Sequence, residues 1–335
     1  MINIKQDVSL LPYNTFGVSA TASVFVESDN VAEIAEFIRS VPDSSAILLL
    51  GSGSNVLFAS ERCDIVVRFV KRGIEVIDEN EDDVLVCAYA GEVWDDFVSW
   101  CVERRYAGVE NLSHIPGTVG ACPIQNIGAY GVEAKETIET VETLEMASGK
   151  TVIFNKEQCQ FDYRDSFFKR NKGKYLITSV QFRLSKKFEP IVKYGDLQLE
   201  LVSNAHTTIE GVRWAIINIR NKKLPNPTEL GNAGSFFKNP TISNEKADEF
   251  KQIDSHVHMY PVSSEYNKIS AAWLINNAVE RGLREGNVGI HKNQSLVIVN
   301  YGGATGKEIL DFASKISKIV RDTLGVELEM EVNVI

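Results

Sequence analysis

The chain has 335 residues, more than one typical hydrophobic core accommodates, so two or three domains are expected. Hydrophobic residues make up 44% and charged residues 24%, which is typical of folded globular proteins and excludes a disordered chain. The formal net charge of −10 argues against nucleic acid as the main partner, because a protein that binds polyanions through charge carries a basic surplus.

The N-terminal segment and the cysteines indicate a protein of the cytoplasm. The first 17 residues contain no basic segment followed by an apolar run, so we expect no secretory signal. No stretch reaches the roughly 18 apolar residues that span a bilayer, so we expect no membrane association. The five cysteines contain no C-x-x-C pair and are expected to be free thiols in a reducing compartment: Cys63, Cys87, Cys101, Cys122 and Cys159.

The first third of the chain is predicted to combine short strands with two helices. Helical spacing is present over 30–41 and again from Trp94, with Gly108 predicted as the end of the second helix. Strands are expected at five segments with apolar or alternating patterns: 21–28, 45–50, 64–70, 73–80 and 84–90. Residues 109–131 are then rich in glycine and predicted to be a loop.

The remaining chain continues this mixture. Strands are predicted over 138–147, 150–155 and 175–184, and a helix over 211–224. The Pro/Asn/Gly-rich segment 225–234 is typical of a domain junction. The last third adds further periodic segments, and a closing strand is predicted over 326–335. Many short strands with fewer helices predict an α+β fold rather than a strict βαβ alternation.

The segment LLLGSGSNVLF at 48–58 invites comparison with a dinucleotide fingerprint. Gly51 and Gly53 follow an apolar strand, but Val56 stands where the third glycine belongs, and no helix follows. No suitable acidic residue follows about twenty positions on. The segment therefore does not match the classical dinucleotide-binding motif. Two interpretations remain: a plain turn, or a nest of backbone N–H groups that holds a pyrophosphate.

The segment HIPGTVGACPIQNIGAYGVE at 114–133 favours function over a purely structural loop. It carries four glycines among neutral hydroxyl and amide side chains, and few charges. Glycine removes side chains where a flat cofactor approaches, and neutral polar groups can contact a heterocycle and its phosphates. A loop of about 20 residues without secondary structure is also unusual in a compact domain unless it has a function.

Other motifs are weak on their own. The Arg164–Asp165 pair, Tyr194, and the basic residues at 220–223 are each explained equally well by a solvated surface. Two histidines in DSHVH at 254–258 lack further ligands, so no metal site is predicted. In GNAGSFFKNP at 231–240, Ser235 is either a turn residue or a hydroxyl that glycines leave accessible to a ligand.

Taken together, these segments resemble one family. YNTFGVSA, LLLGSGSNVLF, NLSHIPGTVGACPIQNIGAYGVE, YRDSFFK, GNAGSFFKNP, AAWLINNA and GIHKNQSLVIVN are similar, in the same order, to motifs of the UDP-N-acetylenolpyruvoylglucosamine reductase (MurB) family. The resemblance runs from about residue 10 to the C-terminus. The tyrosine in VKYGDL is similar to that of the longer class in this family, which closes a tyrosine-bearing loop over the substrate.

The resemblance implies a fold and a reaction. The fold is α+β, with a two-subdomain FAD-binding module of the VAO/PCMH type and a C-terminal α+β substrate-binding domain. The implied domains are 1–68 and 69–215 for FAD, 216–325 for substrate, and a C-terminal strand at 326–335. The implied reaction is reduction of UDP-N-acetylglucosamine enolpyruvate to UDP-N-acetylmuramate in peptidoglycan precursor synthesis, with NADPH as co-substrate and FAD as non-covalent cofactor.

The resemblance also assigns roles to single residues of this chain. The catalytic set is Ser235 as proton donor, Arg164 and Glu331. The expected substrate contacts are Tyr130, Tyr194, Lys223, Asn239 and Gln294. The expected FAD contacts come from the two glycine-rich segments: Gly51, Ser52, Gly53, Ser54, Asn55, Pro116, Gly117, Thr118, Gly120, Ala121, Gln125, Asn126 and Gly128.

The C-terminal motif departs from the family pattern. Where the family usually ends Leu-Glu-Pro-Glu-Val-Arg, this chain has Met330 in place of the proline and Asn333 in place of the arginine. Glu331 is carried over as the second glutamate of the motif, with Glu329 as the less favoured candidate. We expect the loss of the arginine to weaken one substrate contact without removing the acid/base set.

Two alternatives differ in class from this prediction. The same flavin fold is compatible with an oxidase or dehydrogenase of a small alcohol, and a non-enzymatic flavin- or nucleotide-binding module is a third reading. Lys223 and Tyr194 favour a nucleotide-sugar substrate over the first, and the set of Arg164, Ser235 and Glu331 is unexplained by the second. Beyond its small-molecule substrate we expect no partner and a monomeric protein.

Overall fold

The structure is a computed structural model that describes residues 2–43, 46–192, 195–204 and 207–335. The chain forms two compact units, each interrupted in sequence. The first comprises 1–8, 21–53 and 62–222, and the second comprises 9–20, 54–61 and 223–335. The sequence predicted contiguous domains, whereas the second unit also takes in two short segments from the N-terminal part of the chain.

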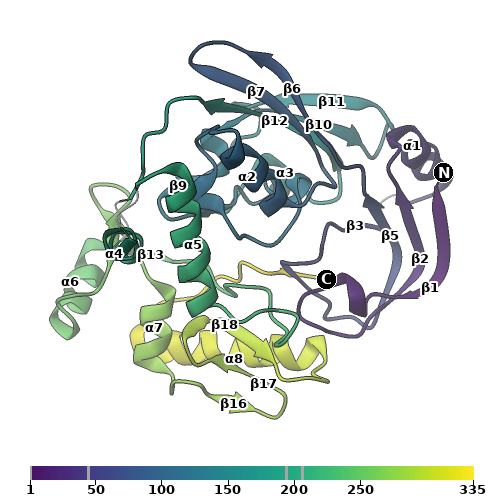
Figure 1. The fold of residues 1–335 in the computed structure, drawn as a ribbon. Helices are drawn as coiled ribbons and strands as arrows, with labels where there is room; N and C mark the ends of the chain where they lie inside the picture. The colour runs from purple at the N-terminus through teal and green to yellow at the C-terminus, as the bar shows by residue number, and fades with distance from the viewer. Residues whose placement is uncertain (1, 44–45, 193–194, 205–206) are drawn as a thin grey trace. The chain divides into compact units, whose positions relative to one another are not determined.

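The first unit begins with a four-stranded sheet in the order β1-β2-β5-β3 (Figure 1). Its strands are β1 (Asn3–Ser9), β2 (Thr21–Ser28), β3 (Ile47–Leu49) and β5 (Arg62–Phe69). β2 and β3 each pair in parallel with β5, and α1 (Val31–Ser40) connects β2 to β3. The Asn30 side chain accepts from the Ala32 N–H at 2.9 Å, so α1 begins at the cap that the sequence supplies.

A five-stranded antiparallel sheet forms the rest of the framework of the first unit. Its order is β11-β10-β12-β7-β6. The bounds are β6 (Ile74–Glu79), β7 (Asp83–Tyr89), β10 (Ile138–Glu145), β11 (Thr151–Asn155) and β12 (Tyr175–Ser185). The bounds of these strands agree closely with the predicted segments.

Two helices, α2 (Trp94–Glu103) and α3 (Phe167–Arg170), lie on one side of the five-stranded sheet (Figure 1). α2 packs through Phe97, whose ring centroid lies 4.6 Å from that of Phe182 on β12. The predicted end of this helix at Gly108 is wrong. Arg105 already adopts a left-handed backbone (φ 58°), and the Tyr106 N–H donates to the Cys101 carbonyl at 2.9 Å, which closes the helix at Glu103.

Two further helices complete the first unit. α5 (Ile209–Lys223) was predicted, whereas α4 (Gly195–Asn204) was not. They share a small separate core in which Leu197 and Leu201 of α4 meet one face of α5. Between the larger elements lie short turns and strands: η3 (Glu110–Leu112), η4 (Val119–Ala121), η5 (Ala134–Glu136), β8 (Gly128–Ala129) and β9 (Val132–Glu133).

The second unit contains three small sheets and three helices. The sheets have the orders β13-β15-β14, β16-β17-β18 and β19-β4. Their strands are β4 (Val56–Leu57), β13 (Thr241–Ser243), β14 (Met259–Pro261), β15 (Tyr266–Ile269), β16 (Arg284–Glu285), β17 (Val288–His291), β18 (Gln294–Asn300) and β19 (Asn333–Val334). The helices are α6 (Asn244–Ile253), α7 (Ala271–Ala278) and α8 (Gly306–Leu324), with a short 3-10 turn, η1 (Leu11–Tyr13).

The core of the second unit lies where α7 and α8 pack against β17 and β18. α8 has caps at both ends: Thr305 and Glu308 form a capping box, and Gly325 takes the left-handed conformation (φ 69°) after the last turn. Phe236 and Phe237 are 0% and 1% exposed, which confirms the prediction that both are packing residues.

The closing strand predicted over 326–335 is only partly confirmed. Regular pairing is confined to β19, which runs parallel to β4, with an isolated bridge between Phe237 and Met330 before it. The C-terminal residues therefore line up between two partners, the 231–240 segment and residues 55–57, rather than in one continuous strand.

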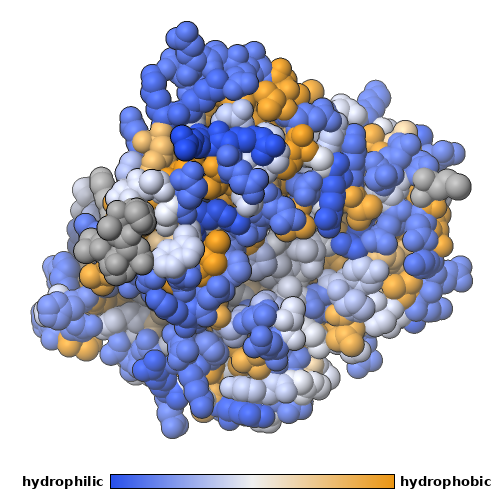
Figure 2. All heavy atoms as spheres, in the orientation of Figure 1, coloured by the Kyte–Doolittle hydropathy of each residue, from blue (hydrophilic) through white to orange (hydrophobic). Residues whose placement is uncertain are grey.

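Among the described residues, no helix is both long and apolar enough to cross a bilayer. On the face in Figure 2, the described residues are mostly hydrophilic, and hydrophobic ones lie among them in small groups.

Candidate active site

The two glycine-rich segments predicted to bind the cofactor meet in the first unit. A Cβ atom placed on Gly51 would lie 3.2 Å from the Thr118 hydroxyl oxygen and 3.9 Å from the Ala121 Cβ. Gly51 lies two residues after the end of β3 at Leu49, and Gly53 adopts φ 69°, a backbone conformation that L side chains rarely take. A side chain at Gly51 would therefore crowd the Thr118 hydroxyl of the second loop.

Backbone hydrogen bonds hold residues 117–120 against the end of β7 and the start of α2. The Gly120 N–H donates to the Ala90 carbonyl at 3.0 Å, and the Trp94 N–H donates to the Gly117 carbonyl at 3.1 Å. A Cβ on Gly120 would lie 2.6 Å from the Ala90 Cβ, so glycine is required here for packing within the protein. Pro116, at the start of this loop, is exposed.

Asn126 is turned inward. It is 0% exposed, and its Nδ2 donates to Glu133 Oε2 and to the Asp162 carbonyl, both at 3.0 Å. Its Oδ1 accepts from the Lys135 N–H at 3.0 Å. Both amide hydrogens and the carbonyl oxygen are therefore engaged inside the protein, while the neighbouring Gln125 is partly exposed.

Arg164 lies in a tight loop between β11 and α3. Its backbone is left-handed (φ 52°), and Nη2 donates to the Gly128 carbonyl at 2.6 Å. The Lys169 Nζ donates in turn to the Arg164 carbonyl at 2.9 Å. The guanidinium is thus placed at Gly128, the last of the predicted cofactor contacts.

Tyr130 is joined to a cation that the sequence did not single out as a partner. Burial raises the pKa of the Tyr130 hydroxyl, and a side-chain hydrogen bond with Arg220 of α5 opposes this. Burial likewise lowers the pKa of the Arg220 guanidinium, while Tyr130 and Asp95 counteract it. Arg220 Nε also donates to the His114 carbonyl at 3.1 Å, so this arginine links α5 to the cofactor loop.

Asp95 and Arg213 extend this link, and sequence reasoning missed both. The two arginine nitrogens Nη1 and Nη2 donate to the Asp95 carboxylate at 2.6 and 2.9 Å. Asp95 also accepts from the N–H of His114, whose backbone is left-handed (φ 61°) just before the loop. Burial alone would raise the pKa of Asp95, but these donors hold it below its usual range. No short motif signals such a pair, because its members are 118 residues apart.

The second unit brings Ser235 and Glu331 onto neighbouring segments. Ser235 forms a bridge with Val297 of β18, and the next residue, Phe236, accepts from the Glu331 N–H at 2.8 Å through its carbonyl. Ser235 is half-buried, and none of the residues that the structure describes forms a hydrogen bond with its hydroxyl.

Asn55 holds the other side of the Glu331 segment. Its Nδ2 donates to the Glu331 carbonyl at 3.3 Å. Its carbonyl accepts from both the backbone N–H and the side-chain Nδ2 of Asn333, each at 3.1 Å. Asn333, which stands where the family usually has arginine, therefore has a structural role beside β4. Ser54 and Asn55 belong to the second unit, whereas Gly51 to Gly53 belong to the first.

Asn239 and Gln294 share one arrangement. The Asn239 Oδ1 accepts from the Ala271 N–H at 2.9 Å, at the first residue of α7. The Gln294 Oε1 accepts from the Leu296 N–H at 3.4 Å. In both, the amide oxygen is turned to the backbone, and no acceptor among the described residues engages the amide nitrogen. Each presents N–H donors, which suits an anionic ligand.

The two remaining predicted substrate contacts lie at or beyond the described elements. Lys223 is the last residue of α5 and the first of the continuous part of the second unit. Tyr194 lies outside the described residues. Within the first unit the structure joins Gly51 to Thr118 and Arg164 to Gly128, and within the second it joins Ser235, Glu331 and Asn55.

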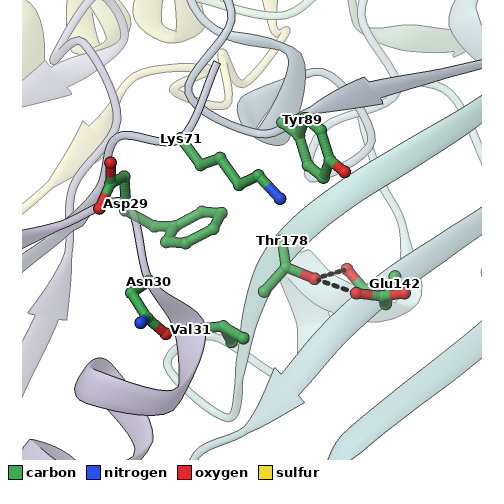
Figure 3. Close-up of a pocket in the computed structure, with 8 residues that line it drawn as sticks. Asp29, Asn30, Val31, Lys71, Tyr89, Glu142 and Thr178 are labelled. Atoms are coloured by element: carbon green, nitrogen blue, oxygen red, sulfur yellow. Dashed lines mark hydrogen bonds between the residues drawn. The ribbon is translucent and has the colours of Figure 1, made fainter. Parts of the chain in front are cut away.

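A separate cavity of about 360 Å³ lies in the first unit (Figure 3). The Lys71 amine lies over the Tyr89 ring, 3.5 Å from its centroid, and the Thr178 hydroxyl donates to Glu142 at 3.0 Å. The lining residues include none of the predicted cofactor or substrate contacts: Asp29, Asn30, Val31, Phe69, Lys71, Tyr89, Glu142 and Thr178.

Family models match both parts of the chain. The model described as "FAD binding domain" matches residues 22–155. The model described as "UDP-N-acetylenolpyruvoylglucosamine reductase, C-terminal domain" matches residues 226–335. The first range contains all of the predicted cofactor contacts, and the second contains Ser235, Asn239, Gln294 and Glu331.

Whole-length relatives carry the same description. The chain is 41% identical to the UDP-N-acetylenolpyruvoylglucosamine reductase of Flavobacterium johnsoniae, with 100% of both chains covered. It is 41% identical to that of Pseudomonas aeruginosa, with 99% of both covered. In fold it is similar to the crystal structure of MurB from Thermus caldophilus, with a TM-score of 0.71, 23% identity, and coverage of 100% of this chain and 99% of that one.

Proposed function

The chain belongs to the UDP-N-acetylenolpyruvoylglucosamine reductase family, and on that premise we propose which of its residues carry the reaction. It is an FAD-dependent oxidoreductase that uses NADPH to reduce UDP-N-acetylglucosamine enolpyruvate to UDP-N-acetylmuramate, a step of cell-wall synthesis. Its fold is an α+β FAD-binding module of the VAO/PCMH type with an α+β substrate domain. A VAO-like oxidase of another small substrate is not favoured, because the relatives share their name over the whole chain.

The residues of the first unit fit FAD. Gly51 and the Thr118–Ala121 turn form a cradle that a Cβ atom at Gly51 would crowd, 3.2 Å from the Thr118 hydroxyl. Backbone N–H groups around Gly53 and the hydroxyls beside it supply the neutral donors that a pyrophosphate needs. The last of the proposed cofactor contacts is Gly128, whose carbonyl accepts a hydrogen bond from Arg164. Bound FAD, once reduced by NADPH, supplies the hydride that adds to the terminal enol carbon.

Ser235 is the proposed proton donor. Hydride addition leaves charge on the adjacent carbon and on the carboxylate attached to it, and Ser235 Oγ–H protonates that carbon. The hydroxyl makes no hydrogen bond with any described residue, so no bond inside the protein must break before it donates. A serine hydroxyl is a weak acid in water, but a strongly basic carbanion accepts its proton when the two atoms are well placed. Solvent then restores the serine proton.

Arg164 and Glu331 are proposed to stabilise the charge that develops. The guanidinium of Arg164 can hold the substrate carboxylate while charge spreads onto it, a role that suits a planar, permanently charged group. Glu331, when it carries a proton, donates a hydrogen bond to the dianionic intermediate. The backbone of Glu331 is fixed between Phe236 and Asn55, which supports a role that needs a fixed position.

The substrate contacts are proposed from their donors. The amide nitrogens of Asn239 and Gln294 offer neutral N–H groups, and Lys223 offers charge, to the diphosphate of the UDP-sugar. Tyr130, joined to Arg220, and Tyr194 are proposed as further substrate contacts. The finer assignment of the remaining cofactor contacts, and the division of the FAD module at residue 68, are part of the same proposal, as are a monomeric state and a cytoplasmic location.

The observation that carries this function is the full-length identity to reductases together with the uncommitted Ser235 hydroxyl. Purified protein should be yellow, and NADPH should bleach its flavin band. Addition of UDP-N-acetylglucosamine enolpyruvate should then restore the band and produce UDP-N-acetylmuramate. A colourless protein that cannot be reconstituted with FAD, or a reduced flavin that the substrate leaves unchanged, contradicts the function.

A further inference from the structure

Asn232 lies three residues before Ser235 and is fully engaged inside the second unit. It is 3% exposed. Its Oδ1 accepts from the Gly234 N–H at 3.0 Å, and its Nδ2 donates to the carbonyls of Leu230 at 2.8 Å and Pro225 at 3.2 Å. Every hydrogen-bonding function of the side chain is therefore used.

The contact with Gly234 fixes the residue directly before Ser235. Gly234 has a left-handed backbone (φ 71°), and nothing lies within 4 Å of the position that a Cβ would occupy there. Packing on that side therefore does not define its conformation. The Asn232 amide supplies a directional hydrogen bond in place of packing, and so fixes the direction in which the chain enters Ser235.

The other two contacts tie this turn to the segment that follows Lys223. Pro225 is two residues beyond Lys223, and its carbonyl is held by the same amide group that holds Gly234. The Asn232 backbone N–H is anchored separately, by the Thr15 carbonyl at 2.9 Å. The Asn232 side chain thus connects the turn before Ser235, the proposed proton donor, to the segment after Lys223, a proposed diphosphate contact. The backbone of Asn232 is itself held in place by Thr15.

We propose that Asn232 is a positioning residue for Ser235, and that it also sets where the chain after Lys223 lies. The proposal rests on the proposed function of Ser235. It differs from a general structural role because it predicts an effect confined to the half-reaction with the UDP-sugar: reduction of the flavin by NADPH does not use Ser235, whereas reoxidation by the enolpyruvate substrate does.

Asn300 provides a matched control. It is also a buried asparagine of the second unit, at 4% exposure, and its side chain is also fully engaged. Nδ2 donates to the Phe16 carbonyl at 2.9 Å, and Oδ1 accepts from the N–H groups of Gly302 and Ala304 at 2.9 and 3.2 Å. Its side chain contacts neither Gly234 nor Pro225. Loss of this amide therefore removes a comparable set of hydrogen bonds without releasing the Ser235 turn.

The test measures both half-reactions by stopped-flow flavin absorbance in FAD-loaded Asn232→Ala, Asn232→Asp and Asn300→Ala. We expect Asn232→Ala to slow reoxidation by substrate about 10- to 100-fold, the loss that small misplacement of a reacting group causes, with reduction by NADPH within about twofold of normal. Asn300→Ala should leave both rates within about twofold. Asn232→Asp keeps an acceptor for the Gly234 N–H and loses the donors to Pro225 and Leu230, so it should retain more of the reoxidation rate than alanine while raising KM for the UDP-sugar.

The proposal is overturned if Asn232→Ala reoxidises at the normal rate, if it slows both half-reactions equally, or if Asn300→Ala slows reoxidation as much. If Asn232→Ala does not fold, Asn232→Asp with normal rates and a normal KM overturns it as well. Ser235→Ala, measured in parallel, distinguishes a failure of the proposed function from a failure of this inference. Normal reoxidation in Ser235→Ala removes the proposed function itself, whereas slow Ser235→Ala with normal Asn232→Ala removes only this inference.

Discussion

Asn126 and Asn239 lie in two glycine-rich segments that the sequence treats alike, yet the structure uses their amides in opposite ways. In the first unit, all three hydrogen-bonding functions of Asn126 are consumed by Glu133, Lys135 and Asp162. In the second, the Asn239 oxygen is held by the Ala271 N–H, and no described residue accepts from its nitrogen. The Asn126 amide therefore stabilises its own loop, whereas the Asn239 amide nitrogen has N–H donors that no described residue uses.

This difference changes how each segment serves the reaction. In the cofactor module, polar side chains such as Asn126 hold the loop, and close backbone approach forms the cradle at Gly51 and Thr118. In the substrate unit, backbone pairing with β18 and the Asn232 side chain hold the loop, which leaves Ser235 and Asn239 for the ligand. A glycine-rich motif therefore does not by itself reveal which of its polar residues contact a ligand.

The largest expected effect is on stability, from Asn126→Ala. The change removes three hydrogen bonds and leaves the Lys135 N–H without its acceptor. The Glu133 carboxylate keeps its ion pair with Lys135, and the Asp162 carbonyl keeps the Asp165 N–H. We expect a loss of roughly 3 kcal/mol in the free energy of unfolding, since each of the three hydrogen bonds contributes about 1 kcal/mol. KM for the UDP-sugar should not change in the protein that remains folded. Urea unfolding measures the first quantity, and a normal unfolding midpoint with loss of FAD would instead place the Asn126 amide at the cofactor.

The next effect is on substrate binding, from Asn239→Asp. Aspartate keeps an oxygen for the Ala271 N–H but replaces the outward N–H donors with a carboxylate oxygen. We expect KM for the UDP-sugar to rise about 10- to 100-fold, because a hydrogen bond to a charged group contributes about 1.5–3 kcal/mol. The thermal midpoint should stay near that of the unchanged protein. Steady-state kinetics with an unchanged KM would show that Asn239 does not face the diphosphate.

The smallest effect is a pH dependence of the cofactor module. The folded-state pKa of Asp95 is below its unfolded value, so its pair with Arg213 stabilises the protein fully above the unfolded pKa and loses this as pH falls through the folded pKa. Asp95→Asn should lower the free energy of unfolding at pH 7 by about 1 kcal/mol, because the pair is partly exposed to solvent, and the difference should shrink below about pH 4.

Asp96→Asn is the matched control for that comparison, because Asp96 is the next residue on α2 and is exposed. It should change stability little at any pH. A difference between Asp95→Asn and the unchanged protein that stays constant from pH 7 to about pH 3 would contradict the role given to the ion pair.

Much of the fold follows from local pattern, because strand and helix periods are visible in short windows. β2 coincides with the predicted segment 21–28, and α1 begins directly after its Asn30 cap. The end of α2 was misplaced, because Arg105 takes a left-handed conformation that the sequence favours at Gly108. Local pattern also cannot show that residues 9–20 and 54–61 join the C-terminal unit, since this depends on pairing such as that of β4 with β19.

The candidate site likewise has features that the sequence predicts and features that depend on the fold. Motif resemblance located Ser235 and Glu331, but only the structure shows that the Glu331 N–H binds the carbonyl of Phe236. A sequence motif does not specify the direction of a side chain. The sequence alone therefore could not show that the amides of Asn126 and Asn232 point inward while that of Asn239 points outward. The Asp95–Arg213 pair was missed because its members are far apart in sequence.

The most direct test of the account is Ser235→Ala in stopped flow, with the flavin followed through both half-reactions. Reduction by NADPH should proceed within about twofold of the normal rate, since this step needs no proton from Ser235. Reoxidation by UDP-N-acetylglucosamine enolpyruvate should slow by about 10²- to 10⁴-fold, the contribution typical of a positioned general acid. Reoxidation at the normal rate, with normal formation of UDP-N-acetylmuramate, would contradict the assignment of Ser235 as the proton donor.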